Sequence, residues 1–267
     1  MPILHAIVLG IVQGLSEFLP ISSSGHLELT RWAFGWDSLP DDLERPFDVA
    51  VHLGTLVGAV AYLRHDVVKY LRAGLAPLRG AALGVDGRIA WFLAVSAVPA
   101  ASAGVVADSL LDDLDHIWLI AVMLIVFGLV LLIADRRPER RALREFRLRD
   151  ALMMGFGQAL ALQPGVSRSG ATLTVSRMLG FEREAAARLV FLMSLPIVGG
   201  AGVYSLLDAS IPADFWAPFL WGMASSAFTG CVGVWGMVRL VNTRSFTPFV
   251  IYRVAVGLVV LIVVAIG

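Results

Sequence analysis

The stretch Gln13-Gly-Leu-Ser-Glu-Phe-Leu-Pro-Ile-Ser-Ser-Ser-Gly-His26 interrupts an otherwise apolar N-terminal segment. It places a carboxylate, a run of hydroxyl groups and an imidazole where an apolar helix would be expected to continue. Ionisable groups in hydrophobic surroundings lose favourable hydration, so such a stretch is expected only where it binds a polar group. The stretch therefore predicts a broken helix that presents a binding site.

A second stretch far downstream, Gln158-Ala-Leu-Ala-Leu-Gln-Pro-Gly-Val-Ser-Arg-Ser-Gly-Ala-Thr172, repeats this plan. Both stretches run from a glutamine through an apolar spacer to a proline, a hydroxyl cluster and a glycine. The second adds Arg168 among its hydroxyl groups. Gly25, Gly165 and Gly170 suit the tight turns that broken helices require. We expect the rest of the chain to bring the two stretches together.

The whole chain is too apolar for a soluble domain. Of its 267 residues 58% are hydrophobic and the mean hydropathy is +0.79, whereas soluble domains usually contain about 45–50% apolar residues. A bilayer requires runs of about 20 apolar residues. Such runs predict six transmembrane helices, at 47–63, 89–108, 116–134, 185–207, 216–238 and 248–266.

Two further stretches, 2–34 and 151–178, are predicted to enter the membrane and return. Residues 2–12 would form a helix of roughly 15 Å, about half the hydrocarbon thickness, so this helix cannot cross alone. Residues 25–34 would form the return, followed by an exposed acidic loop over 36–48. The predicted fold is an all-α polytopic membrane protein with six spans and two re-entrant helix-loop-helix segments.

The distribution of basic residues predicts how the chain is oriented. If the arginine-rich run 136–149 is cytoplasmic, most Lys and Arg residues lie on that side, as the positive-inside rule requires. The other cytoplasmic segments would be 64–88, which reads as an interfacial amphipathic segment, 177–188 and 239–253. The acidic region 108–115 and both termini would face the exterior. The arginine-rich run would contact anionic lipid, and no nucleic-acid site is expected.

This orientation predicts an internal symmetry. The two re-entrant segments enter from opposite sides, and each is followed by three spans. Residues 1–134 and 151–267 would then form an inverted repeat joined by a basic cytoplasmic hinge at 135–150. Inverted repeats of this kind place broken helices and a binding site near the membrane midplane.

The residues around Arg168 indicate what the site binds. Ser167, Ser169 and Thr172 surround this guanidinium at the expected start of a helix, where forked donors and the helix dipole both favour phosphate oxygens. The ligand is expected to be a phosphate ester or a diphosphate. The alternative is a structural ion pair between Arg168 and Glu17, with the serines serving only as helix caps.

The first stretch offers groups for catalysis. Ser23 and His26 are three residues apart, hence on one face of a helix, and Glu17 could orient the imidazole. This arrangement predicts a serine nucleophile activated by a histidine. The alternative for His26 is a hydrogen-bonded residue at a helix cap. The remaining histidines lack metal-binding spacing and are expected at polar edges: His5, His52, His65 and His116.

At these residues the sequence resembles the undecaprenyl-diphosphate phosphatase family, also known as the bacitracin-resistance family. Its first signature, a glutamate or glutamine, three residues and a glutamate, appears as Gln13 and Glu17 and continues to His26. Its second signature, Pro-Gly-x-Ser-Arg-Ser-x-x-Thr, matches Pro164 to Thr172 without a mismatch. Phe47-Asp-Val-Ala-Val-His-Leu-Gly54 and the overall layout also agree, so the resemblance covers essentially the whole chain.

The resemblance implies an enzyme of the bacterial plasma membrane that hydrolyses undecaprenyl diphosphate to undecaprenyl phosphate and inorganic phosphate at the outer face. This reaction recycles the lipid carrier for peptidoglycan synthesis and confers bacitracin resistance. A divalent cation, Mg²⁺ or Ca²⁺, is implied, with Glu17 as a candidate ligand, and a homodimer is compatible with the family. The implied catalytic residues are Glu17, Ser23, His26 and Arg168. The predicted phosphate contacts are Gln13, Ser22, Ser24, Gly25, Gly165, Ser167, Ser169 and Thr172.

Three matters stay open at this level. Gln13 cannot act as an acid, a base or an anionic ligand, so a mechanism that needs two carboxylates in the first signature is in question. The nucleophile could be Ser23, His26 or a metal-activated water. A lipid flippase or transporter is the rival function, because opposed re-entrant segments in an inverted repeat are also a transporter architecture.

Overall fold

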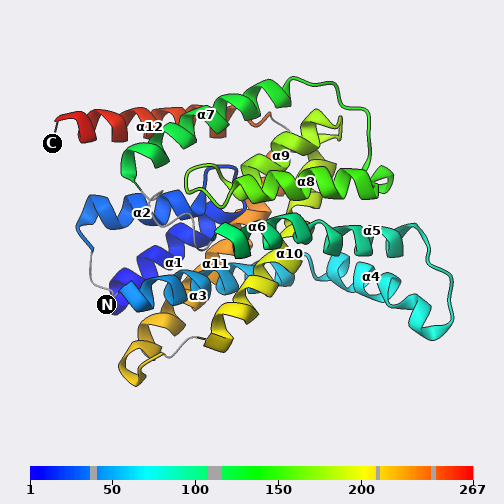
Figure 1. Cartoon of the computed structure of the whole chain (residues 1–267), viewed down its shortest axis with the longest axis horizontal. Helices are drawn as coiled ribbons and strands as arrows, with labels where there is room; N and C mark the ends of the chain where they lie inside the picture. The colour runs from blue at the N-terminus through cyan, green and yellow to red at the C-terminus, as the bar shows by residue number, and fades with distance from the viewer. Residues whose placement is uncertain (37–40, 108–115, 209–210, 242–244, 267) are drawn as a thin grey trace.

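The computed structural model describes residues 1–36, 41–107, 116–208, 211–241 and 245–266, and within these ranges the chain is built of α-helices (Figure 1). The N- and C-termini lie at the same end of the molecule. The helices are α1 Ile3–Glu17, α2 Ser23–Phe34, α3 Asp41–Tyr62, α4 Arg64–Gly74, α5 Val85–Val95, α6 Ala97–Ala107, α7 Ile117–Asp135, α8 Leu148–Leu160, α9 Arg168–Met178, α10 Arg183–Asp208, α11 Trp216–Val241 and α12 Thr247–Ile266.

Each of the six predicted spans coincides with a helical stretch. Five stretches are long and apolar enough to cross a membrane, namely Val85–Val106, Ile117–Asp135, Arg183–Ser205, Ala213–Val241 and Thr247–Ile266. The sixth is Leu43–Tyr62, which passes the same criterion together with α4, although α4 is bent away from it by 87°. The chain is therefore a polytopic membrane protein. The bend turns α4 out of the direction of α3.

The two predicted breaks are present, between α1 and α2 and between α8 and α9. The first helix is longer than predicted, because α1 continues to Glu17 and does not end near residue 12, and α2 begins at Ser23 and not at Gly25. The signature residues therefore lie at the end of one helix, in a short loop, and at the start of the next. We call residues 18–22 the first loop and residues 161–167 the second loop.

Small residues let α1 approach α11 closely. A Cβ atom on Gly14 would lie 2.6 Å from the Ser226 carbonyl oxygen, and one on Gly230 would lie 3.1 Å from the Cα of Thr55 in α3. Glycine at these positions therefore allows helix backbones to pack at short range, as is common in membrane bundles. The glycine-rich part of α11 serves packing inside the chain.

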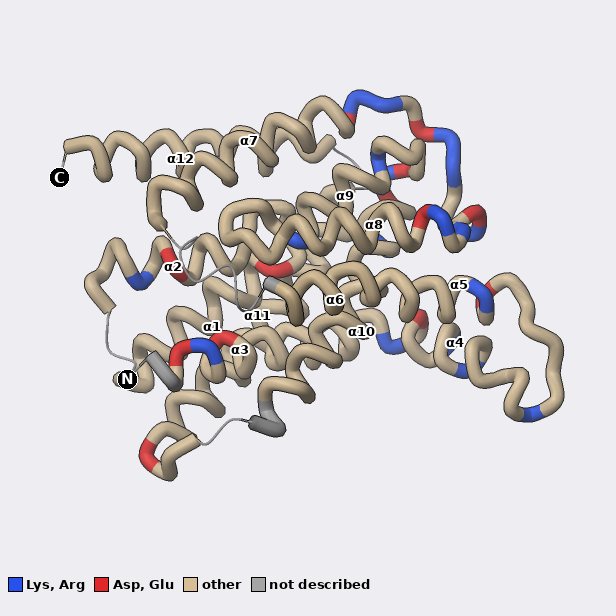
Figure 2. The backbone as a smooth tube through the Cα atoms, viewed as in Figure 1, with Lys and Arg blue, Asp and Glu red and all other residues tan. Residues whose placement is uncertain are grey.

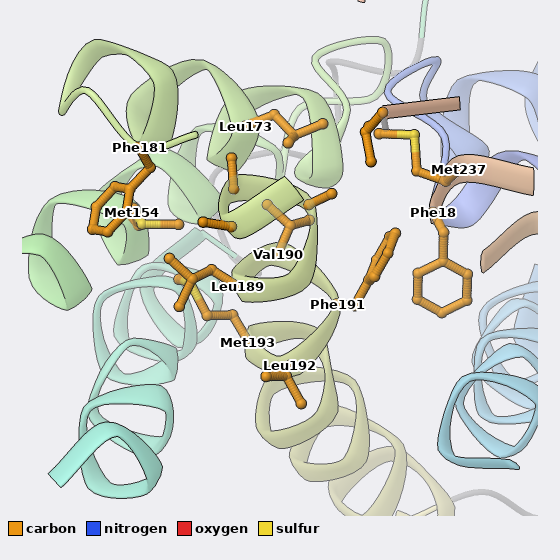
Figure 3. Packing of buried hydrophobic residues seen from close by; sticks show 14 of the residues in the cluster. Phe18, Met154, Leu173, Phe181, Leu189, Val190, Phe191, Leu192, Met193 and Met237 are labelled. Atoms are coloured by element: carbon orange, nitrogen blue, oxygen red, sulfur yellow. The ribbon is translucent and has the colours of Figure 1, made fainter. Parts of the chain in front are cut away.

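The largest hydrophobic cluster fixes the first loop to α10. Phe18 packs edge-to-face on Phe191 with ring centroids 5.6 Å apart, and it is almost fully buried. Figure 3 shows Phe191, Val190 and Leu189 of α10 among neighbours that include Leu173 from α9 and Met154 from α8. Because one cluster contains residues from both broken helices, it holds the two loops in a fixed relation.

Basic residues gather at one end of the molecule, whereas acidic residues lie at both ends (Figure 2). Most Lys and Arg residues lie on the connection from α7 to α8 and around α4 and α5. Within the hinge, Arg141 donates to both carboxylate oxygens of Asp150, at 3.0 and 2.6 Å. This hydrogen bonding raises the pKa of Arg141. The hinge is therefore tied to the start of α8.

The predicted acidic loop after α2 is partly helical. Asp41–Asp48 forms the start of α3, while residues 37–40, like 108–115, lie outside the described residues. Arg31 is buried and pairs with Glu44 at 3.0 Å and also with the carboxylate of Asp48. The expectation of a fully exposed loop over 36–48 was wrong, because these carboxylates neutralise an arginine of α2 and pin α2 to α3.

Candidate active site

The first and second loops touch. The Gly165 backbone N–H donates to the Ser22 hydroxyl oxygen at 3.1 Å, and the Ser169 hydroxyl donates to the Leu19 carbonyl at 2.9 Å. The Arg168 guanidinium donates to the Glu17 carboxylate. The expectation that the two stretches meet is confirmed, and the meeting point brings together residues about 150 positions apart in sequence.

The residues that precede α2 and α9 share an unusual backbone conformation. Ser22 has φ 76° and Ser167 has φ 75°, the two positive values among the described non-glycine residues. A non-glycine residue in this region is strained by about 1–3 kcal/mol, and such strain often occurs at functional sites. The Ser167 hydroxyl accepts from the Gly170 N–H at 3.1 Å, so it does cap α9. Both helix N-termini thus begin at the contact between the loops, where they favour an anion.

Glu17 is the centre of the polar contacts. Its carboxylate accepts hydrogen bonds from Arg168, from the Ser23 hydroxyl and, at 2.8 Å, from the Gln13 side-chain amide. The carboxylate is buried. The Gln13 amide oxygen is also buried and has no hydrogen-bond partner. An unpaired buried oxygen is costly, so this position favours a further ligand at Gln13.

His52 joins this cluster, although the sequence analysis assigned it to a polar edge. Its Nδ1 donates to the Asp48 carbonyl at 2.7 Å, and its Nε2 lies 3.5 Å from the Glu17 carboxylate. The expectation of a polar-edge role for His52 was wrong, since its imidazole lies beside the buried Glu17 carboxylate. That role was expected because no second histidine stands at metal-binding spacing from His52. The signal that could have identified it was its place within the Phe47–Gly54 stretch.

His26 does not contact Ser23 in this structure. Its Nδ1 donates to the Ser22 carbonyl at 2.7 Å, and its Nε2 accepts from the Tyr252 hydroxyl at 2.8 Å. Both ring nitrogens therefore have hydrogen-bond partners other than Ser23, namely the Ser22 carbonyl and the Tyr252 hydroxyl. The predicted serine–histidine relay is replaced by a direct hydrogen bond from Ser23 to Glu17.

The other predicted phosphate contacts are placed as follows. Gly25 and Gly165 serve close packing, since a Cβ on Gly165 would lie 2.5 Å from the Ile120 carbonyl and Gly165 has φ 91°. The Thr172 hydroxyl donates to the Arg168 carbonyl at 2.8 Å, so it is engaged within α9. Ser24 is half-buried in the first turn of α2.

Arg253 of α12 is a site residue that the sequence analysis missed. Its fully buried guanidinium donates to Pro20 O in the first loop at 3.1 Å, and to Gly165 O and Val166 O in the second loop at 2.9 and 3.0 Å. In the sequence Arg253 resembles a residue that flanks an apolar run, but its side chain is buried against both loops. These partners are neutral carbonyls, so they leave its positive charge beside the loops unneutralised.

The structural alternative is partly realised, because the Arg168–Glu17 pair and the Ser167 cap are both present. An ion pair that only locks two helices would not need Ser23, Gln13 and His52 around the same carboxylate. The cluster therefore goes beyond a structural pair and resembles a carboxylate, a hydroxyl and a guanidinium arranged for phosphate chemistry.

No group of three or more His, Cys, Asp or Glu side chains in the described part of the chain could hold a metal ion. Glu17 offers one carboxylate, and the unpaired Gln13 amide oxygen lies beside it. Mg²⁺ is commonly held by one or two carboxylates together with substrate phosphates. These residues therefore fit a cation that binds together with a diphosphate, and not a cation held by the protein alone.

Comparison with known proteins identifies the family of the chain. A family model described as "Bacitracin resistance protein BacA" matches residues 6–259. The chain belongs to the BacA family. Similar curated proteins include the undecaprenyl-diphosphatase of a Nocardioides species, 43% identical over 99% of this chain and 97% of that protein. The undecaprenyl-diphosphatases of Geobacter sulfurreducens (44%, 96% of each chain) and Pelotomaculum thermopropionicum (41%, 99% and 98%) match this BacA chain over comparable lengths.

Proposed function

We propose that this BacA-family protein is a membrane phosphatase that hydrolyses undecaprenyl diphosphate to undecaprenyl phosphate and inorganic phosphate. The observation that carries the proposal is the contact between the two loops, which places Ser23 and Arg168 on one carboxylate, that of Glu17. The names of the relatives support the choice of substrate. A diphosphate supplies the oxygens that an arginine and two helix N-termini favour.

In the proposed reaction, the terminal phosphate takes the place of Glu17 as the partner of Arg168. Glu17 then accepts the proton of Ser23, whose oxygen attacks the terminal phosphorus while the bond to the bridging oxygen breaks. Undecaprenyl phosphate leaves, and water hydrolyses the phosphoserine to release inorganic phosphate. Arg168 and Arg253 offset the negative charge throughout, which is the main contribution that proteins make to phosphoryl transfer. Glu17, and not His26, is the proposed base, because it is the group that Ser23 contacts.

A divalent cation, Mg²⁺ or Ca²⁺, is proposed to bind with the substrate, held by Glu17, the Gln13 amide oxygen and the phosphate oxygens. The cation would offset diphosphate charge. Arg168 would orient the terminal phosphate from the second loop, whether or not a cation is bound.

The membrane arrangement is also proposed. The gathering of Lys and Arg at one end of the molecule supports placing that end in the cytoplasm and both termini outside (Figure 2). The shared φ of Ser22 and Ser167 supports two re-entrant segments in an inverted repeat, with halves 1–134 and 151–267. In this orientation the site opens to the outer face of the bacterial plasma membrane. The product would be reused for peptidoglycan synthesis, and the activity would confer bacitracin resistance.

The test is phosphate release from undecaprenyl diphosphate by the purified protein in detergent. No membrane then separates two sides, so release requires an enzyme, whereas a flippase would release none. The Ser23→Ala variant is expected to lose at least a hundredfold in kcat, and a phosphorylated peptide containing Ser23 should be trapped in the unaltered protein. Near-normal turnover of Ser23→Ala, or phosphate found on His26, would exclude Ser23 as nucleophile and favour His26 or water.

A further inference from the structure

A groove runs between α2 and α12, beginning at the candidate active site. Its volume is about 660 Å³, and it is lined by His26, Leu29 and Trp32 from α2 and by Val256, Val259 and Val263 from α12, among others. This volume lies within the range of about 300–1,000 Å³ that is typical of ligand pockets. The groove is therefore large enough for part of a substrate.

His26 connects the groove to the loops. The imidazole lines the inner end of the groove, while its Nδ1 donates to the Ser22 carbonyl in the first loop at 2.7 Å. Tyr252 of α12 lies against His26, with its hydroxyl 2.8 Å from His26 Nε2 and its ring stacked on the imidazole at a centroid distance of 5.5 Å. A molecule that lies in the groove would reach the loops past this pair.

Beyond His26 the groove offers little to a polar ligand. The Thr30 hydroxyl donates to the His26 carbonyl within α2 at 2.6 Å and is thereby engaged. The floor is formed by Leu29 and Val260, which pack with Ile120 and Leu124 of α7 in one buried cluster. Trp32 and the valines of α12 form walls that are partly exposed. A diphosphate would find no partner there, whereas a branched hydrocarbon chain would.

We propose that this groove binds the polyprenyl chain of the substrate, with its first isoprene units beside Val256 and Val259 and the diphosphate at the two loops. The inference rests on the proposed phosphatase function and adds a subsite for the lipid chain. In a bilayer, lipid tails are as apolar as leucine, so the groove can select a chain only by close van der Waals packing and shape. The methyl branches of an isoprenoid suit a wall of β-branched valines better than a straight acyl chain does.

Among the described residues, three other hollows make poorer candidates for the polyprenyl chain. They have volumes of about 240, 450 and 390 Å³ and are bordered by Arg188, Arg144 and Arg64 respectively. None of their lining residues belongs to the candidate site. The α2–α12 groove combines a site residue at one end with an apolar lining along its length.

The proposal is tested by narrowing the far end of the groove. Val263 lies about 16 Å beyond Tyr252 along α12, at 1.5 Å per residue, so the short chain of geranyl diphosphate does not reach it. Val263→Trp should displace roughly ten carbon contacts of a long chain, which corresponds to about a tenfold rise in KM for undecaprenyl diphosphate. The KM for geranyl diphosphate should stay within about twofold of the unaltered value.

The matched control is Ile262→Trp, the adjacent residue of α12, which is similarly exposed (56% against 47%) and does not line the groove. This variant should leave both KM values within about twofold. An unchanged ratio of the two KM values in Val263→Trp, or the same change in Ile262→Trp, would overturn the proposal. If the unaltered protein releases phosphate from neither substrate, the proposed function fails, and the crosslinking experiment below then decides whether the groove binds the chain.

A second measurement tests the same proposal if Val263→Trp folds poorly. A photoreactive benzophenone residue at position 259 should crosslink radiolabelled undecaprenyl diphosphate in phospholipid vesicles, and unlabelled undecaprenyl phosphate should compete. The same residue at position 258 should give little crosslinking, because Leu258 does not line the groove. Crosslinks only to phospholipid, with no competition, would show that bilayer acyl chains fill the groove and would refute the assignment.

Discussion

Replacing Glu17 by Gln should separate catalysis from binding. In the structure Glu17 accepts hydrogen bonds from both Arg168 and Ser23. Its carboxylate therefore competes with the diphosphate for the Arg168 guanidinium, and it is also the proposed acceptor of the Ser23 proton. Glu17→Gln keeps the shape of the side chain and removes the charge. The variant should therefore turn over more slowly and bind a diphosphate more tightly.

The two magnitudes follow from these contacts. Loss of a positioned general base costs about 10²–10⁴ in rate, so kcat should fall by that factor. The attraction between Glu17 and Arg168 is about 4 kcal/mol at an effective dielectric constant of 20, and Arg168 is about one-fifth exposed, which screens part of it. If about 1.4 kcal/mol of this competition is relieved, diphosphate affinity should rise about tenfold.

The assay has two arms. Phosphate release from undecaprenyl diphosphate gives kcat, and binding of inorganic pyrophosphate, measured calorimetrically in chelator, gives an affinity that does not depend on a cation. Gln13→Leu is the control for the pyrophosphate arm, because it removes a neighbour of Glu17 without releasing Arg168, and the chelator excludes the cation that Gln13 is proposed to hold. The reasoning is refuted if Glu17→Gln retains kcat within about tenfold, or if it binds pyrophosphate more weakly than the unaltered protein.

Three further outcomes are expected. Arg253→Lys should lower kcat about a hundredfold, because one ammonium group cannot reach the carbonyls of both loops as the guanidinium does. Circular dichroism should show little loss of helix in this variant. A normal kcat would contradict the role of Arg253. Tyr252→Phe keeps the ring on His26 and removes its hydroxyl donor, so kcat should fall about three- to tenfold, the cost of about one hydrogen bond, while Tyr204→Phe, a largely exposed control, should have no effect. Chelator should abolish phosphate release and added Mg²⁺ should restore it, while the melting temperature should change only when diphosphate is also present; stabilisation by Mg²⁺ alone would point to a site held by the protein.

Much of the architecture was predictable because it depends on local patterns. The six spans follow from runs of about 20 apolar residues, and the breaks follow from polar signatures that no apolar helix would contain. Even so, the observed helix boundaries differ from the predicted ones. The first helix extends to Glu17 because the Gln13 amide nitrogen and the Ser16 hydroxyl donate within it, to the Glu17 carboxylate and the Val12 carbonyl, so these polar residues did not end it.

The candidate site was only partly predictable, because several of its members come from distant segments. Glu17, Ser23 and Arg168 were found from their signatures. The signatures did not reveal His52, Tyr252 and Arg253. A single polar residue within an apolar span has no local pattern that shows which groups its side chain contacts. The partner of His26 could not be predicted either, because the choice between Ser23 and the Ser22 carbonyl depends on the backbone at Ser22, whose φ is 76°.

The charge around the two loops is positive overall and favours a diphosphate. Arg168 and Arg253 against Glu17 leave one positive charge, and the N-termini of α2 and α9 add about half a charge each, giving roughly +2 in all. These groups come from distant parts of the chain, because Glu17 and α2 lie near the N-terminus whereas Arg168, α9 and Arg253 lie in the C-terminal part. A diphosphate therefore stabilises the contact between the two loops as it binds, and a cation bound with it would offset the charge that remains. The loops are consequently expected to be most rigid with substrate bound, which measurement of backbone hydrogen exchange at Gly165 and Gly170 would show as slower exchange when inorganic pyrophosphate is added.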